Sequence, residues 1–136
     1  MPASAVDKNV FDKGLEFILS NANEAVILTS DPSTFSDTQD TPSSGGLRLG
    51  AFNVSSSIMS IEDDGSGGRE LVLEEKGYLA PTSDTATHIA LVDTESSNLI
   101  IYTEYDDGNG NGISVTEDLA YNAGPTTFTL SEFTVA

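Results

Sequence analysis

The sequence predicts a mainly β fold, an antiparallel β-sandwich or tulip-like barrel with one N-terminal α-helix. Short runs of β-branched and aromatic residues begin at Glu24 and recur to the end of the chain, separated by Gly, Asp, Ser and Pro. Apolar residues at helical spacing occur only before that point. The 136 residues fit one domain, so we expect a single β-rich domain over residues 1–136.

The predicted helix covers about residues 7–22. Its apolar positions repeat at i, i+4, i+7 and i+8, which places them on one face. Ser4 and Asp7 mark its start, and Asn21 to Asn23 mark its end. The residues on the apolar face are Phe11, Leu15, Ile18, Leu19 and Ala22.

Strand-like runs account for most of the remaining chain. The predicted strands are 24–30, 47–54, 57–62, 69–75, 86–93, 98–105, 113–117 and 126–135. Sequences rich in Gly, Asp and Ser at 62–68 and 94–98 predict turns. In the last strand Phe128 and Phe133 fall on opposite parities, so either a bulge shifts the face or both faces are covered.

The acidic Ser/Thr/Pro segment at 31–46 interrupts this pattern. Phe35 is nearly its only apolar residue, and a loop of this length is unusual in a small domain. Two alternatives are open for it: an arm that lies on a neighbouring subunit, or a disordered surface loop.

The charge balance excludes several classes of partner. Twenty-two Asp and Glu stand against five Lys and Arg, a formal net charge of −17. Such a surface repels phosphate backbones and anionic lipids, so neither nucleic acid nor membrane is expected as a partner. There is no cysteine, and neither a signal peptide nor an apolar run long enough to span a membrane is evident, so we expect synthesis in the cytoplasm.

The sequence DDGNGNG at 106–112 has two interpretations. Oxygen ligands at alternate positions, a glycine, a backbone carbonyl and a carboxylate in the twelfth position are typical of a calcium loop. The candidate ligands are Asp107, Asn109, Asn111, the carbonyl of Ile113, and Asp118. The same residue types also favour the turn of a β-hairpin between 98–105 and 113–117, without an ion. Apart from possible Ca²⁺, no cofactor is expected.

No catalytic constellation is evident, so the chain is not expected to be an enzyme. His88 is the only histidine, and its apolar strand context favours a hydrogen-bonded strand histidine over a base or a metal ligand. No G-x-S-x-G or phosphate-loop sequence occurs. Arg48 and Arg69 stand beside glycine turns, where they could pair with carboxylates of the same chain or face an acidic partner, and we expect the internal pairing.

Five sequence stretches carry a resemblance that spans nearly the whole chain: FDKGLEFIL, AVILTSDPSTF, GSGGREL, THIALVD and FTLSEFTVA. In this order they resemble a family of small structural proteins of tailed-phage and prophage virions, capsid decoration or tail-associated proteins. The family carries no catalytic residues that transfer to this chain, and the acidity and the DDGNGNG stretch depart from its pattern.

The resemblance implies a virion structural protein that is made in the host cytoplasm. The leading expectation is a capsid decoration, or cement, protein that binds the outer surface of the phage head and stabilises it. Its partners would be the major capsid protein and copies of itself, as trimers or other small oligomers. The alternative is a tail- or fibre-associated module that recognises a host surface, with calcium at 107–118.

Overall fold

The predicted helix and the mainly β character of the chain are both confirmed. The structure, a computed structural model, describes residues 8–63, 69–105, 110–117, 119–123 and 126–130. Helix α1 (Lys8–Asn21) comes first. The strands are β1 (Glu24–Leu28), β2 (Arg48–Asn53), β3 (Met59–Asp63), β4 (Arg69–Leu73), β5 (Lys76–Leu79), β6 (Asp84–Ala86), β7 (His88–Asp93), β8 (Asn98–Glu104), β9 (Ile113–Val115), β10 (Ala120–Ala123) and β11 (Thr126–Leu130). Three short 3-10 helices are η1 (Phe35–Thr38), η2 (Pro42–Ser44) and η3 (Ser56–Ile58).

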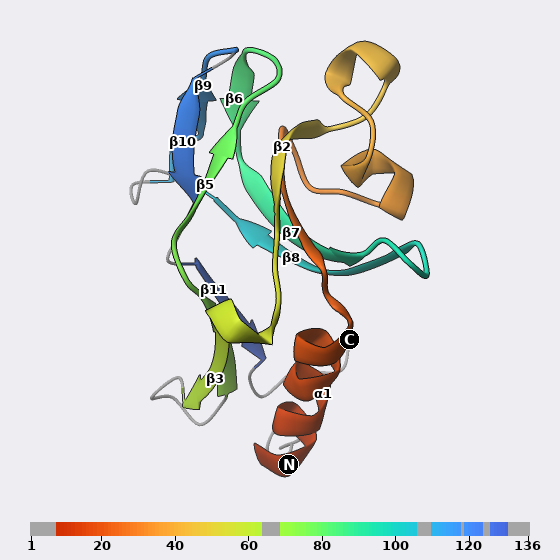
Figure 1. Cartoon of the computed structure of the whole chain (residues 1–136), viewed down its shortest axis with the longest axis vertical. Coiled ribbons are helices and arrows are strands. Elements are labelled where there is room, and N and C mark those ends of the chain that lie inside the picture. The colour runs from red at the N-terminus through yellow and green to blue at the C-terminus, as the bar shows by residue number, and fades with distance from the viewer. Residues whose placement is uncertain (1–7, 64–68, 106–109, 118, 124–125, 131–136) are drawn as a thin grey trace, which may run out of the picture.

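The strands in the described residues form four antiparallel sheets in a β-sandwich-like arrangement (Figure 1). The largest sheet has the order β2-β1-β7-β8, and a three-stranded sheet has the order β11-β4-β3. Two smaller sheets pair β10 with β5 and β6 with β9. The short strands β5, β6 and β10 were not predicted, because none of them has an apolar run of its own.

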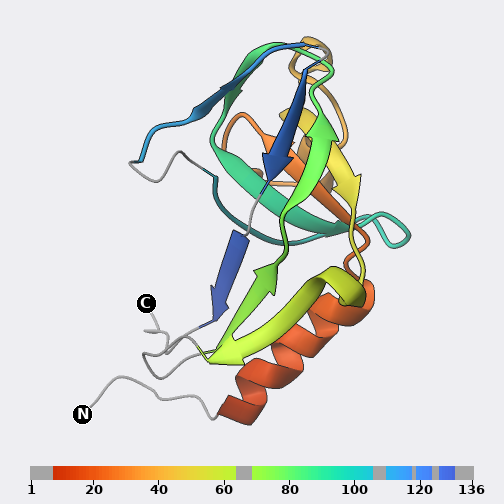
Figure 2. The same cartoon turned by 60° about the vertical axis from the view of Figure 1, so that its left-hand side comes forward.

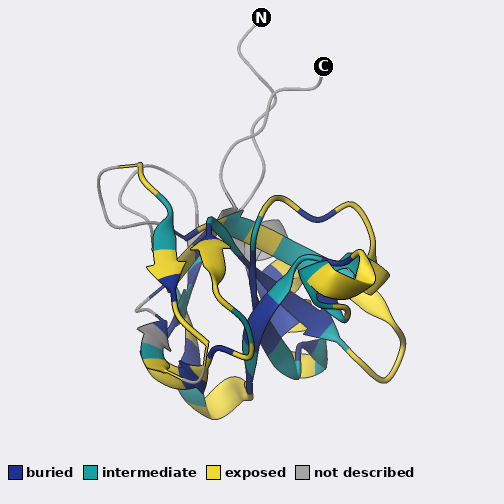
Figure 3. Ribbon diagram, turned by 90° about the horizontal axis from the view of Figure 1, so that it is seen from above, coloured by how far each residue is buried: buried dark blue, intermediate teal, exposed yellow. Residues whose placement is uncertain are grey.

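The two central strands of the largest sheet are buried on both faces, which explains why their sequences are continuously apolar. Ala25, Ile27, Ile89 and Leu91 point into the main core. The alternate residues form a second, smaller cluster: Val26, Leu28, Ala90 and Val92. Figure 3 shows buried positions in these interior strands, and exposed positions in the turns, the helix and the outer strands.

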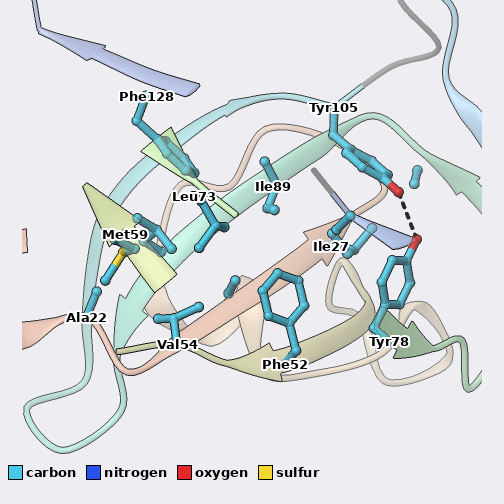
Figure 4. Packing of buried hydrophobic residues seen from close by; sticks show 14 of the residues in the cluster. Ala22, Ile27, Phe52, Val54, Met59, Leu73, Tyr78, Ile89, Tyr105 and Phe128 are labelled. Atoms are coloured by element: carbon cyan, nitrogen blue, oxygen red, sulfur yellow. Dashed lines mark hydrogen bonds between the residues drawn. The ribbon is translucent and has the colours of Figure 1, made fainter. Parts of the chain in front are cut away.

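The main core contains residues of this sheet, of the three-stranded sheet and of α1, and Figure 4 shows part of it. Leu15 and Ile18 of the helix are buried, and Figure 2 shows α1 lying along β3 and β4. Phe128 of β11 is fully buried in the same core. Phe133, which carried the alternative parity of the last predicted strand, lies outside the described residues.

The acidic segment 31–46 folds back onto its own sheet, which neither of the two alternatives from the sequence anticipated. It contains η1 and η2, and Phe35 packs with Leu47 against the second cluster. Asp37 accepts hydrogen bonds from the backbone of Ser33 and Thr34, and these bonds hold the pKa of its carboxyl below the ordinary value. Buried Thr38 donates to the carbonyl of Phe35. The segment therefore covers the second face of the sheet.

Candidate functional site

The segment after β8 does not close the predicted hairpin. β8 pairs with β7, and β9 pairs with β6, with Ile113 opposite Ala86. The stretch 106–112 therefore connects two different sheets. Gly112 passes so close to β6 that an added Cβ would lie 2.5 Å from Cγ2 of Thr85 and 2.9 Å from the carbonyl oxygen of Ala86. A glycine here is explained by this close approach, without any ion.

The calcium ligands predicted from the sequence fall mostly outside the part of the chain that is described. Asp107, Asn109 and Asp118 are outside the described residues. Asn111 is exposed, and Ile113 lies in β9. Among the described residues, no group of three or more acidic or histidine side chains could hold a metal ion. The calcium site stays a prediction.

A pocket of about 180 Å³ opens beside this segment. Thr87, His88, Glu104, Gly110 and Gly112 line it. His88 of β7 and Glu104 of β8 are register partners, so their side chains lie on the same face of the sheet. The turn predicted at 94–98 joins these two strands, but the sequence does not show their register, which shifts between Leu91 and Val92.

His88 lies in β7, and one of its two ring nitrogens has a hydrogen-bond partner. Its Nδ1 lies 2.8 Å from Oγ1 of Thr87. Its ring meets the ring of Tyr102 edge-on, with 5.9 Å between the centroids. These contacts fix the orientation of the imidazole, which lines the pocket.

Arg48 pairs within the chain, as predicted. Its two terminal nitrogens donate to the two carboxylate oxygens of Glu24, at 3.0 and 3.2 Å, and it also donates to the carbonyl of Thr38. Since Glu24 begins β1 and Thr38 ends η1, this one side chain ties the covering segment to the sheet. Arg69 lies in β4 opposite Asp63, but its side chain is outside the described set.

β8 forms one edge of the largest sheet, and no described strand pairs with its outer side. The amide of Tyr105 donates to the carbonyl of Thr87 at 2.8 Å, so Glu104 occupies a non-hydrogen-bonded position. By alternation, Tyr102 and Glu104 both direct their backbone N–H and C=O groups outward. The side chain of Tyr102 is 44% exposed at this edge.

Two buried tyrosines, Tyr78 and Tyr105, form a hydroxyl–hydroxyl contact in the main core. The hydroxyls of Tyr78 and Tyr105 lie 3.3 Å apart (Figure 4). Burial is the main cause that raises the pKa of both phenols above the ordinary value. The pair is a neutral hydrogen-bonded contact between β5 and the end of β8, which sequence patterns gave no signal for.

Comparison with known proteins adds no relative: no family model, no curated protein and no solved structure matches this chain. No helix in the described part of the chain is long and apolar enough to cross a membrane.

Proposed function

We propose that this protein is a structural component of a tailed-phage virion, a decoration protein that binds the outer surface of the head and stabilises it. The observation that supports this most is the edge of β8 with which no described strand pairs, and which offers outward N–H and C=O groups beside an exposed aromatic ring. An extended segment of a partner can add to such an edge as a further strand. The partners we propose are the major capsid protein and other copies of this chain.

The stabilising effect would arise from mass action. A protein that binds only the assembled shell lowers the free energy of the shell relative to its dissociated or expanded states. Small oligomers of this chain, such as trimers at symmetry axes, would bring several edges to the shell at once. The acidic surface, with its net charge of −17, would face solvent.

The number of copies of this protein in purified phage particles tests whether it lies on the head or on the tail. We expect hundreds of copies per virion by quantitative mass spectrometry, since a decoration protein covers the whole shell. A few to tens of copies would instead favour the alternative, a tail- or fibre-associated module that recognises a host surface. Absence from the particle would contradict both proposals.

A backbone substitution tests the docking edge. Tyr102→Pro removes an outward N–H that no β7 residue uses, and edge strands tolerate proline for this reason. We expect it to abolish binding to undecorated shells while the circular dichroism spectrum stays that of the folded protein. Tyr102→Ala is the matched control, because it removes the ring and keeps the N–H. Equal binding of Tyr102→Pro and wild type would exclude strand addition at β8.

Calcium binding at Asp107 and Asp118 stays part of the alternative function. If the ion binds there, calcium should raise the melting temperature of the wild-type protein, and Asp107→Ala should remove that rise. No rise at about 10 mM Ca²⁺, well above the dissociation constants of weak extracellular sites, would end this prediction.

A further inference from the structure

The pocket between β7, β8 and residues 110–112 brings together one imidazole and one carboxylate. His88 and Glu104 are register partners at a non-hydrogen-bonded position, where the Cα atoms of a pair lie about 4.5 Å apart. Both residues line the pocket. The sheet therefore places two metal-ligating side chains next to each other at a concave surface.

The hydrogen bonds of Thr87 determine which ring nitrogen of His88 carries the proton. Oγ1 of Thr87 donates to the carbonyl oxygen of Thr29 at 2.8 Å, and a carbonyl can only accept. The single hydroxyl proton is thereby used. Oγ1 must then accept from Nδ1–H of His88, which lies 2.8 Å away. In the neutral ring the lone pair is on Nε2.

Neither Nε2 of His88 nor the carboxylate of Glu104 has a hydrogen-bond partner within the described residues. Imidazole nitrogen with carboxylate oxygen suits zinc and the neighbouring divalent transition metals. A ligand histidine usually donates its other N–H to a fixed acceptor, which here is Thr87. The net charge of −17 also raises the local concentration of cations.

We propose that His88, through Nε2, and Glu104 bind a divalent transition-metal ion in this pocket, with water completing the coordination. Thr87 is a positioning residue, since it orients the imidazole without touching the ion. This site differs from the predicted calcium loop in position and in chemistry, because calcium takes oxygen ligands. It is also independent of the proposed capsid function.

The single histidine makes the proposal directly testable by nuclear magnetic resonance of ¹⁵N-labelled wild-type protein. At about pH 8, where an imidazole is ordinarily neutral, the ring should be in the Nδ1–H tautomer. Adding Zn²⁺ should shift the Nε2 resonance and saturate at one ion per chain. A ring in the Nε2–H tautomer, or a ring unmoved by millimolar Zn²⁺, would overturn the proposal.

Zinc titration calorimetry of variants separates this pocket from the acidic surface. His88→Gln should lose the site, and Glu104→Gln should weaken it. Glu95→Gln removes the same charge from the turn at the far end of the β7–β8 hairpin, so its affinity should equal that of wild type. Unchanged zinc binding in His88→Gln would assign the ion to the surface carboxylates and reject the site.

The role of Thr87 has its own pair of variants. Thr87→Val keeps the branched shape but loses the acceptor for Nδ1–H, so zinc affinity should fall by about 10-fold or more. Thr87→Ser keeps the hydroxyl and should restore most of the affinity. In Thr87→Val the ring should also lose its preference for the Nδ1–H tautomer. Equal affinity of the Val and Ser variants would contradict the positioning role.

Discussion

At the scale of single residues, close contacts explain several positions whose role the sequence left open. Gly50 of β2 is one of them: a Cβ added to it would lie 2.5 Å from Cδ2 of Tyr78. Leu49, its neighbour, is the extra residue of a β-bulge, since Ile27 pairs with Gly50 and Leu28 with Arg48. At the bulge the backbone of β2 lies against a buried tyrosine ring.

Replacing Gly50 with Ala should therefore destabilise the protein. The ring of Tyr78 is only 4% exposed and has little room to move, so we expect a loss of about 1–3 kcal/mol in the free energy of unfolding. Urea denaturation measures this loss. The double variant Gly50→Ala/Tyr78→Leu should lose less than the sum of the single variants, because the clash is then relieved. Strict additivity would show that the ring is not the cause.

The Tyr78–Tyr105 contact predicts a loss of stability at high pH. Both phenols have a raised pKa in the folded state, whereas in the unfolded chain they ionise near the ordinary value of 10.0. Above that pH the unfolded state binds fewer protons than the folded state, so stability is full below about pH 10 and falls as the pH rises further.

Unfolding free energies measured between about pH 8 and pH 11 check this sign. In Tyr78→Phe the decline should be shallower, because one of the two phenols no longer contributes. Exposed Tyr102 supplies the matched control, Tyr102→Phe. If Tyr78→Phe and Tyr102→Phe declined alike, the buried pair would not be responsible.

At the scale of elements, the segment between β1 and β2 acts as a cover for one face of the sheet. A hydrogen bond from Thr29 N–H to the carbonyl of Leu47 joins the two ends of the segment, and one from Arg48 N–H of β2 to the carbonyl of Asp40 ties its middle to the sheet. The apolar contact between this segment and the sheet comes mainly from Phe35 and Leu47, which pack against the second cluster. Few buried side chains hold it, so it should open before the rest of the fold.

Truncating Phe35 to Ala should increase this local opening. Because Phe35 is half-buried, we expect a cost of about 1–2 kcal/mol, below the 3–5 kcal/mol of a fully buried Phe→Ala change. Amide hydrogen exchange should accelerate at Thr29, Leu47 and Arg48 and stay unchanged in β3 and β4. Exposed Ser43→Ala is the control. An equal acceleration in every strand would show that the cover does not open separately.

At the scale of the whole molecule, charge is the dominant property. A net charge of −17 on 136 residues disfavours the compact state through self-repulsion. The described basic side chains are engaged locally, with Arg48 on Glu24 and Lys13 on Glu16. They leave the overall excess of carboxylates uncompensated.

Salt should therefore stabilise the protein. Raising NaCl from about 10 mM to 0.3 M shortens the Debye length from about 30 Å to below 8 Å, and the melting temperature should rise mainly over this range. Differential scanning calorimetry at fixed pH measures it. A rise only above about 1 M would indicate a general solvent effect in place of screening, and a fall would contradict the prediction.

Local patterns predicted the helix, the mainly β class and the internal pairing of Arg48, because each depends on periodicity or on one short-range chemical preference. They did not predict β5, β6 or β10, whose few residues become strands only through their partners. The His88–Glu104 pair was also not predicted, because the turn at 94–98 joins their strands but does not fix which residues lie opposite each other, and the register shifts between Leu91 and Val92. The predicted hairpin at 106–112 was wrong because turn-forming residues do not specify which strand follows as a partner.

The order of strands in the largest sheet also limits when the protein can fold. Strand β1 lies between β2 and β7 in this sheet. Val26 of β1 can therefore pair with Ala90 of β7 only after Ala90 has been synthesised. During synthesis, which adds about 5–20 residues per second, β1 spends several seconds without that partner. The edge at β8 is completed later still, and pairings this distant in sequence are typical of domains that fold in milliseconds to seconds. The nascent chain therefore leaves one side of the apolar strand β1 unpaired on the ribosome until β7, which ends at Asp93, has emerged.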